Sequence, residues 1–93
     1  MKFSNMVQGI NGFLVSLRCD NAFDEQIYTD IKGYLISHSP EWKRNKNIPL
    51  EDAIALFDLI DQLSGGSIFW NEEVQNRVED AILEIQDIIH SME

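Results

Sequence analysis

Residues Asn71–His90 read NEEVQNRVEDAILEIQDIIH and carry the clearest helical pattern in the chain. Asn71 is a favourable N-cap, and Glu72 and Glu73 follow it where the helix dipole favours acids. Steps of four and three separate the main apolar residues here and just beyond: Val74, Val78, Ala81, Ile85, Ile88 and Met92. Such steps keep side chains on one face of an α-helix. The stretch therefore predicts an amphipathic helix with an acidic outer side.

Three earlier segments show the same periodicity, from about Ser4 to Leu17, from about Phe23 to His38, and from Pro49 or Leu50 to Gly65-Gly66. Pro40 is expected to help end the second of them, and the glycine pair to end the third. No segment has a comparable strand pattern. The sequence thus predicts an all-α protein, a compact antiparallel four-helix bundle in which residues 1–93 form a single domain.

Two of these helices carry unusual features. Gly9 and Gly12 lie inside the first predicted helix, where they weaken it or permit a close helix contact. The third is apolar over most of its circumference, so it is expected to be central or to contact a partner. Its predicted outer stripe is short: Glu51, Ala55, Asp58 and Gln62.

Charge is distributed unevenly along the chain. The formal net charge is −9, yet residues 1–47 carry five acids and six bases, whereas residues 48–93 carry eleven acids and one base, Arg77. Phosphates would be repelled by the second half, which argues against nucleic-acid binding. A basic protein partner would be attracted by it. The alternative is that the acidity serves solubility alone.

The bases of the first half include one cluster, in the sequence Lys43-Arg44-Asn45-Lys46-Asn47. Without a nucleic-acid-binding motif around it, a solvated loop is the better interpretation than a DNA contact. Trp42, beside this cluster, is expected to plug the end of the bundle.

The sequence also indicates the cellular compartment of the protein and whether it is an enzyme. Cys19 is the only cysteine, which fits a reducing cytoplasm. The N-terminal residues lack the apolar run of a signal peptide, and no apolar run approaches the roughly 20 residues of a membrane span. Cys19, His38 and His90 are the candidates for nucleophilic or acid–base catalysis, but none stands in a catalytic motif. We therefore expect no enzyme activity and no cofactor.

Residues 61–72, DQLSGGSIFWNE, have the outline of an EF-hand calcium loop. Asp61 and Glu72 open and close it, and Gly66 occupies the sixth position. Leu63 and Gly65 stand where two further oxygen ligands are needed. We therefore predict no metal site, and interpret the stretch as a helix stop followed by a helix start; a degenerate calcium loop is the alternative.

Three bulky apolar residues, Ile68, Phe69 and Trp70, precede the acidic helix. Either all three fill the end of the bundle, or Phe69 or Trp70 stays partly exposed as a binding anchor rimmed by acids. Leu83 is a second candidate anchor, since it falls on the acidic side of the last helix. An exposed leucine is also ordinary on any surface, and that side could instead meet part of its own domain.

In size, acidity and all-α pattern the chain resembles small immunity proteins of nuclease bacteriocins and of contact-dependent growth inhibition systems. It is also similar in size and helix count to pediocin-type bacteriocin immunity bundles. The resemblance implies direct binding of a toxin, over its active site or an adjacent exosite, with no cofactor. The candidate partner-binding residues are acids and anchors: Asp58, Asp61, Phe69, Trp70, Glu72, Glu73, Glu79, Asp80, Leu83, Glu84 and Asp87. The alternative is a helical adaptor or self-associating regulator that pairs through its third helix.

Overall fold

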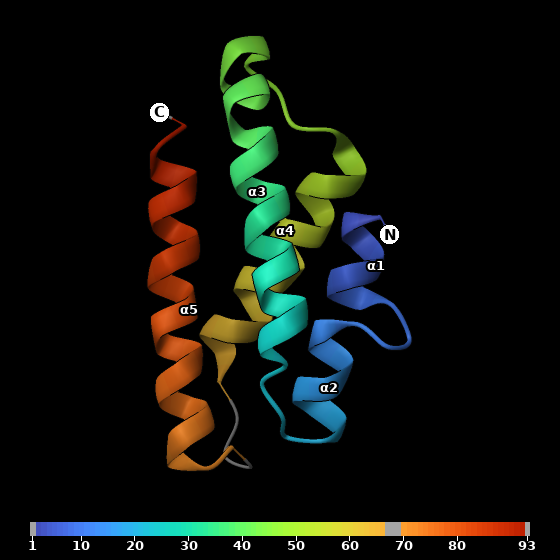
Figure 1. Cartoon of the computed structure of the whole chain (residues 1–93), viewed down its shortest axis with the longest axis vertical. Coiled ribbons are helices and arrows are strands. Elements are labelled where there is room, and N and C mark those ends of the chain that lie inside the picture. Colours follow the sequence, from blue (N-terminus) through green and yellow to red (C-terminus); the bar gives the residue numbers. More distant parts are fainter. Residues whose placement is uncertain (1, 67–69, 93) are drawn as a thin grey trace.

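The structure, a computed structural model, describes residues 2–66 and 70–92. In this part of the chain the regular elements are all helices, which confirms the all-α prediction (Figure 1). They are α1 (Phe3–Gln8), α2 (Phe13–Cys19), α3 (Glu25–Asn45), α4 (Leu50–Gly65) and α5 (Glu72–His90).

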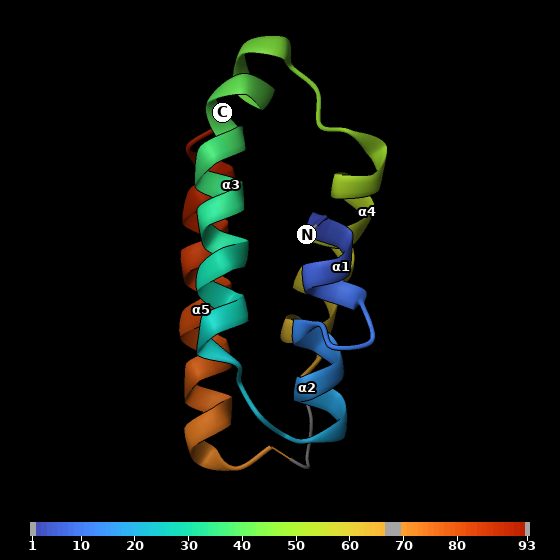
Figure 2. The same ribbon diagram turned by 45° about the vertical axis from the view of Figure 1, so that its right-hand side comes forward.

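The helices form a two-layered bundle. Figure 2 shows α3 and α5 side by side in one layer, with α1, α2 and α4 in the other. The helices of one layer run in the same direction, and the two layers run in opposite directions (Figure 1). The connection from α3 to α4 therefore crosses from one layer to the other, at the end of the bundle where α5 also finishes.

Contacts between α3 and α5 establish their common direction. The Arg77 guanidinium meets the Glu25 carboxylate near the start of both helices. Lys43 Nζ donates to the Ser91 carbonyl, 3.5 Å away, near the end of both. The partners are 52 residues apart at the first contact and 48 at the second, so the two helices run in the same direction side by side.

The predicted first helix is divided into α1 and α2 by a turn at residues 9–12, so the expectation of one continuous helix is wrong. The Gly12 N–H donates to the Gly9 carbonyl at 2.8 Å. A Cβ on Gly12 would stand 2.8 Å from the Asn5 carbonyl oxygen, and one on Gly9 2.5 Å from it. The two glycines thus permit a backbone approach that a side chain would block. Ile10 lies in this turn and is 90% exposed.

Pro40 does not end α3, which continues to Asn45 with the proline inside it. Proline has no N–H to donate to the Ile36 carbonyl one turn earlier. The Ser39 hydroxyl donates to that carbonyl instead, at 3.3 Å. Beyond the proline, Trp42 is buried at the end of the bundle, as predicted, and this packing holds the last turns of α3 in helical conformation.

The predicted helix ends are otherwise confirmed. α4 starts directly after Pro49 and ends at Gly65, and Gly66 takes the positive φ of 68° that favours glycine. The Asn71 side chain accepts a hydrogen bond from the Val74 N–H at 2.8 Å and so caps α5.

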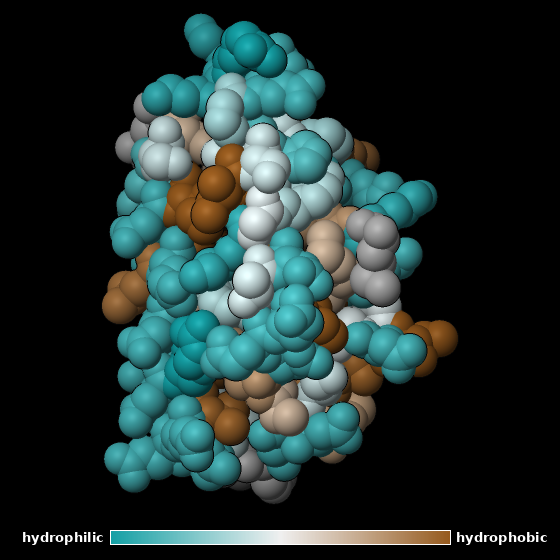
Figure 3. Space-filling model, viewed as in Figure 1, coloured by the Kyte–Doolittle hydropathy of each residue, from teal (hydrophilic) through white to brown (hydrophobic). Residues whose placement is uncertain are grey.

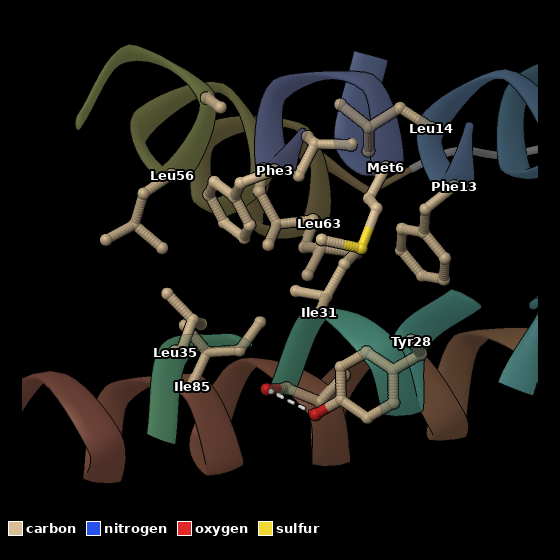
Figure 4. Packing of buried hydrophobic residues seen from close by; sticks show 14 of the residues in the cluster. Phe3, Met6, Phe13, Leu14, Tyr28, Ile31, Leu35, Leu56, Leu63 and Ile85 are labelled. Atoms are coloured by element: carbon tan, nitrogen blue, oxygen red, sulfur yellow. Dashed lines mark hydrogen bonds between the residues drawn. The ribbon is translucent and has the colours of Figure 1, made fainter. Parts of the chain in front are cut away.

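Side chains from both layers fill the core (Figure 4). Phe3, Met6 and Leu63 project from one layer towards Ile31 and Ile85 from the other. The apolar faces predicted for the second and last helices supply the other layer's share, so that part of the sequence interpretation is confirmed.

α4 is rotated relative to the prediction. Ala55, expected on the outer stripe, is fully buried together with Leu59. Glu51 and Asp58 of the predicted stripe lie on a flank that faces α1, because the Ser4 hydroxyl donates to the Glu51 carboxylate at 2.7 Å and the Gln8 amide donates to Asp58. The side of α4 that points away from the core is apolar instead: Leu50, Ile54 and Phe57 are 76%, 51% and 68% exposed.

Candidate functional site

The outward side of α5 carries most of the predicted partner-binding residues. We call it the acidic face, formed by exposed side chains on the opposite side of the helix from the buried ones: Glu72, Glu73, Glu79, Asp80, Leu83 and Asp87. Leu83 is 61% exposed. In Figure 3 the edge of the molecule along α5 is mostly hydrophilic and bears a hydrophobic projection at its outline.

The surface of the acidic face is hollowed. Asp80, Leu83 and Asp87 line one hollow, whose other wall includes the side chains of Arg77 and Glu84. A second hollow nearer the start of α5 reaches the first turn of α3. Carboxylates around an exposed apolar side chain suit a partner segment that combines cationic and apolar groups.

Glu84, although predicted as a contact residue, is engaged within the protein. Lys32 Nζ lies 2.9 Å from Oε2, and Arg77 Nη1 lies 3.1 Å from Oε1. The Tyr28 hydroxyl donates to Oε1 at 3.0 Å. These three donors, with Lys32 the strongest, lower the pKa of Glu84 to about 2. Glu84 thus joins α5 to α3 rather than adding to the outward charge.

Arg77, the only base in residues 48–93, is likewise engaged. Its Nε and Nη2 donate to the two carboxylate oxygens of Glu25, at 2.6 and 3.0 Å. Its guanidinium lies over the rings of Phe23 and Tyr28, 4.6 and 4.9 Å from their centroids. The hydrogen bond with Glu25 is the main reason that the pKa of Arg77 is raised. The acidic face therefore keeps a negative field although a cation lies at its border.

The remaining predicted contact residues do not join the acidic face. Asp58 accepts the Gln8 amide, as described above, and Asp61 is exposed on α4, in the other layer. Trp70 is half-buried, and its indole N–H donates to the Leu17 carbonyl at 3.3 Å, so it packs at the end of the bundle. Phe69 lies outside the described residues.

The structure also presents an exposed apolar surface that is not among the candidate partner-binding residues predicted from the sequence. Leu50, Ile54 and Phe57 recur in steps of four and three on the outward side of α4, and we call them the apolar stripe. Exposed apolar side chains in one row are typical of protein-binding surfaces. The sequence showed that α4 was broadly apolar. It did not show which side faces outward, because the core-facing row of Ala55 and Leu59 is equally apolar.

The structure places the positions that were considered for chemistry or metal binding. Residues 61–65, the first five of the EF-hand pattern, are helical, and Leu63 is buried. Across residues 2–66 and 70–92, no three His, Cys, Asp or Glu side chains are grouped as a metal ion would require. The His38 Nδ1 donates to the Tyr34 carbonyl at 2.9 Å, and its ring stacks on that tyrosine. Cys19 and His90 are exposed.

Comparison of the chain with protein-family models, curated proteins and solved structures gave no match in any of the three. None of the helices within the described residues combines the length and the apolar character needed to cross a bilayer.

Proposed function

We propose that this protein is a non-catalytic inhibitor that binds a basic protein partner through the acidic face of α5. The observation that carries the proposal is the position of Leu83, which is 61% exposed in a hollow that it shares with the Asp80 and Asp87 carboxylates. Carboxylates accelerate the encounter with a basic partner, while a desolvated apolar anchor slows its release. An inhibitor of this kind needs rigid geometry and no chemistry of its own.

The partner class follows from the resemblance to small acidic immunity proteins. We propose a basic, nuclease-type toxin domain that is bound directly, with no cofactor. Nucleic acid is not part of the proposal, because the acidic face would repel phosphates. The lone exposed cysteine, Cys19, fits a cytoplasmic protein in a reducing compartment.

Association kinetics with a basic toxin domain encoded beside this protein's gene would test the proposal. A triple charge reversal, E79K/D80K/D87K, should slow association by about tenfold or more at low salt. The matched control is D20K/D30K/E41K, which makes the same change in net charge at exposed acids outside α5. Equal slowing by both triple variants, or by neither, would contradict an acidic-face interface.

The anchor has its own test. Leu83→Ser should leave the association rate almost unchanged and raise the dissociation rate by about tenfold or more. An unchanged dissociation rate would show that the partner does not desolvate Leu83.

A second function, self-association as an adaptor or regulator, is favoured by the apolar stripe on α4. Its three side chains are each more than half exposed, and a partner copy would remove them from water. Sedimentation equilibrium distinguishes the two candidates. A dimer that Phe57→Glu converts to a monomer, and that Leu83→Glu leaves intact, supports self-association. A wild-type protein that stays monomeric up to about millimolar concentration argues against it.

A further inference from the structure

A hollow that the proposed function does not use is lined by residues from the ends of α3 and α5 and from the connection between α3 and α4. Figure 1 shows that these two helices end on the same side of the molecule as that connection. The volume of the hollow is about 390 Å³, within the range of small-ligand sites. It is bounded by four apolar residues, two bases and one amide: Trp42, Ile48, Ile89, Met92, Lys43, Lys46 and Asn47. It therefore combines an apolar interior with cations at its edge.

This combination contrasts with the rest of the molecule. Lys43 and Lys46 belong to the only basic cluster of a chain whose net charge is −9. Among the described residues, the lining of the hollow contains these two lysines and no carboxylate. The hollow is thus a local cationic site on an acidic protein.

The walls of the hollow are fixed by backbone and packing. The Trp42 carbonyl accepts the N–H of Lys46, which has a positive φ of 58°, and the N–H of Asn47 at 3.2 Å. Trp42 itself is 5% exposed. Lys43 Nζ donates to the Ser91 carbonyl and so links the two helix ends. These contacts fix the backbone that carries Lys46 and place the Lys43 ammonium beside the apolar wall without a ligand.

We infer that this hollow binds a small amphiphilic organic anion. Its carboxylate or sulfonate head would pair with Lys43 and Lys46, and its hydrocarbon body would pack against Trp42, Ile89 and Met92. The charge-assisted bonds fix the head, and the burial of apolar surface supplies most of the affinity. None of these residues belongs to the acidic face. Ligand binding in the hollow and partner binding at the acidic face can therefore be tested independently.

The head-group preference gives the sharpest test, with dodecanoate and dodecylammonium below their micelle concentrations as probes. Trp70→Phe leaves Trp42 as the only tryptophan, so its emission reports on the hollow. Dodecanoate should saturate this signal at a single equivalent, and should bind at least about tenfold more tightly than dodecylammonium. The overall charge of −9 attracts the cation, so nonspecific binding predicts the opposite order. A preference for dodecylammonium, or equal binding, would overturn the inference.

Charge variants locate the site. K43E/K46E should weaken dodecanoate binding by about tenfold or more, and K43Q/K46Q by less, since the second pair removes the cations without adding acids. The matched control K2E/R18E changes the net charge by the same amount as K43E/K46E, at exposed bases that do not line the hollow. Circular dichroism checks that all variants remain helical. Equal losses in K43E/K46E and the control would assign the effect to net charge and contradict a site.

Discussion

The Glu84 carboxylate lies 3.1 Å from the Arg77 guanidinium, two turns earlier on the same helix. Neither residue acts alone: Lys32 and Tyr28 reach Glu84 from α3, and Glu25 of α3 holds the other edge of Arg77. A polar cluster thus joins α3 and α5 beside the aromatic rings of Phe23 and Tyr28.

Glu84→Gln should reduce the free energy of unfolding by about 1–2 kcal/mol at neutral pH. The loss is moderate because the Glu84 side chain is 38% exposed, so that solvent screens its ion pairs. The pKa of Glu84 is lowered from 4.5 to about 2. Its stabilisation is therefore complete above the unfolded pKa and is lost as pH falls from 4.5 towards 2. Urea unfolding across this range should show the wild type approaching the variant. A gap that is constant with pH would contradict this role.

Both tyrosines should titrate late. Burial, and then a hydrogen bond to Asp52, raise the pKa of Tyr34 to about 12. Burial, and then the hydrogen bond to Glu84, raise the pKa of Tyr28 further. Phenolate absorbance should therefore be almost absent in the native protein at about pH 10, where the unfolded chain is half ionised. Stability contributed by Tyr34 is complete below pH 10 and is lost as pH rises towards 12. An ordinary tyrosine titration of the folded protein would refute these environments.

The rotation of α4 can be tested with two glutamates placed two residues apart. Ala55→Glu buries a charge in the core and should cost about 3 kcal/mol or more, enough to unfold the protein or nearly so. Phe57→Glu lies on the outward side and should change stability by only about 0.5 kcal/mol in the monomer. Thermal unfolding at low protein concentration measures both. The opposite order would restore the outer stripe that the sequence predicted.

The turn between α1 and α2 should not tolerate a side chain. Gly12→Ala places a Cβ 2.8 Å from backbone atoms of Asn5 and Gly9, so we expect a loss of about 1–3 kcal/mol.

Gly33→Ala is the matched control, because a Cβ there meets nothing within 4 Å in the middle of α3. It should stabilise the protein by about 0.5–1 kcal/mol through higher helix propensity. Denaturant unfolding of the two variants gives both signs, and a neutral Gly12→Ala would show that the turn can relax.

Local signals predicted much of the fold. Asn71 and Gly66 lie where capping rules place them, and the apolar spacing of the last helix identified its buried side. The prediction that Pro40 helps to end its helix was wrong, because the Ser39 hydroxyl takes over the role of the missing backbone donor. That compensation depends on the helix already being packed, which a proline rule cannot anticipate.

Only part of the candidate site could be predicted, because local sequence does not show which helices pack together. The exposure of Leu83 follows from its angle on α5 relative to Ile85. The internal role of Glu84 does not, since Lys32 and Tyr28 lie more than fifty residues away in the chain.

Sequence patterns alone were sufficient to predict the helices, most of their ends, the acidic outward side of α5 and the apolar spacing that buries its inner side. These features depend on neighbours within a few residues, where backbone geometry fixes which side chains meet. Three features could be read only from the packing of the helices. These are the side of α4 that is buried, the ion pairs that Glu84 makes with α3, and the position of Lys43 and Lys46 beside an apolar hollow. These features depend on which helices pack together. For example, α1 covers one flank of α4, and Leu50, Ile54 and Phe57 remain exposed to solvent.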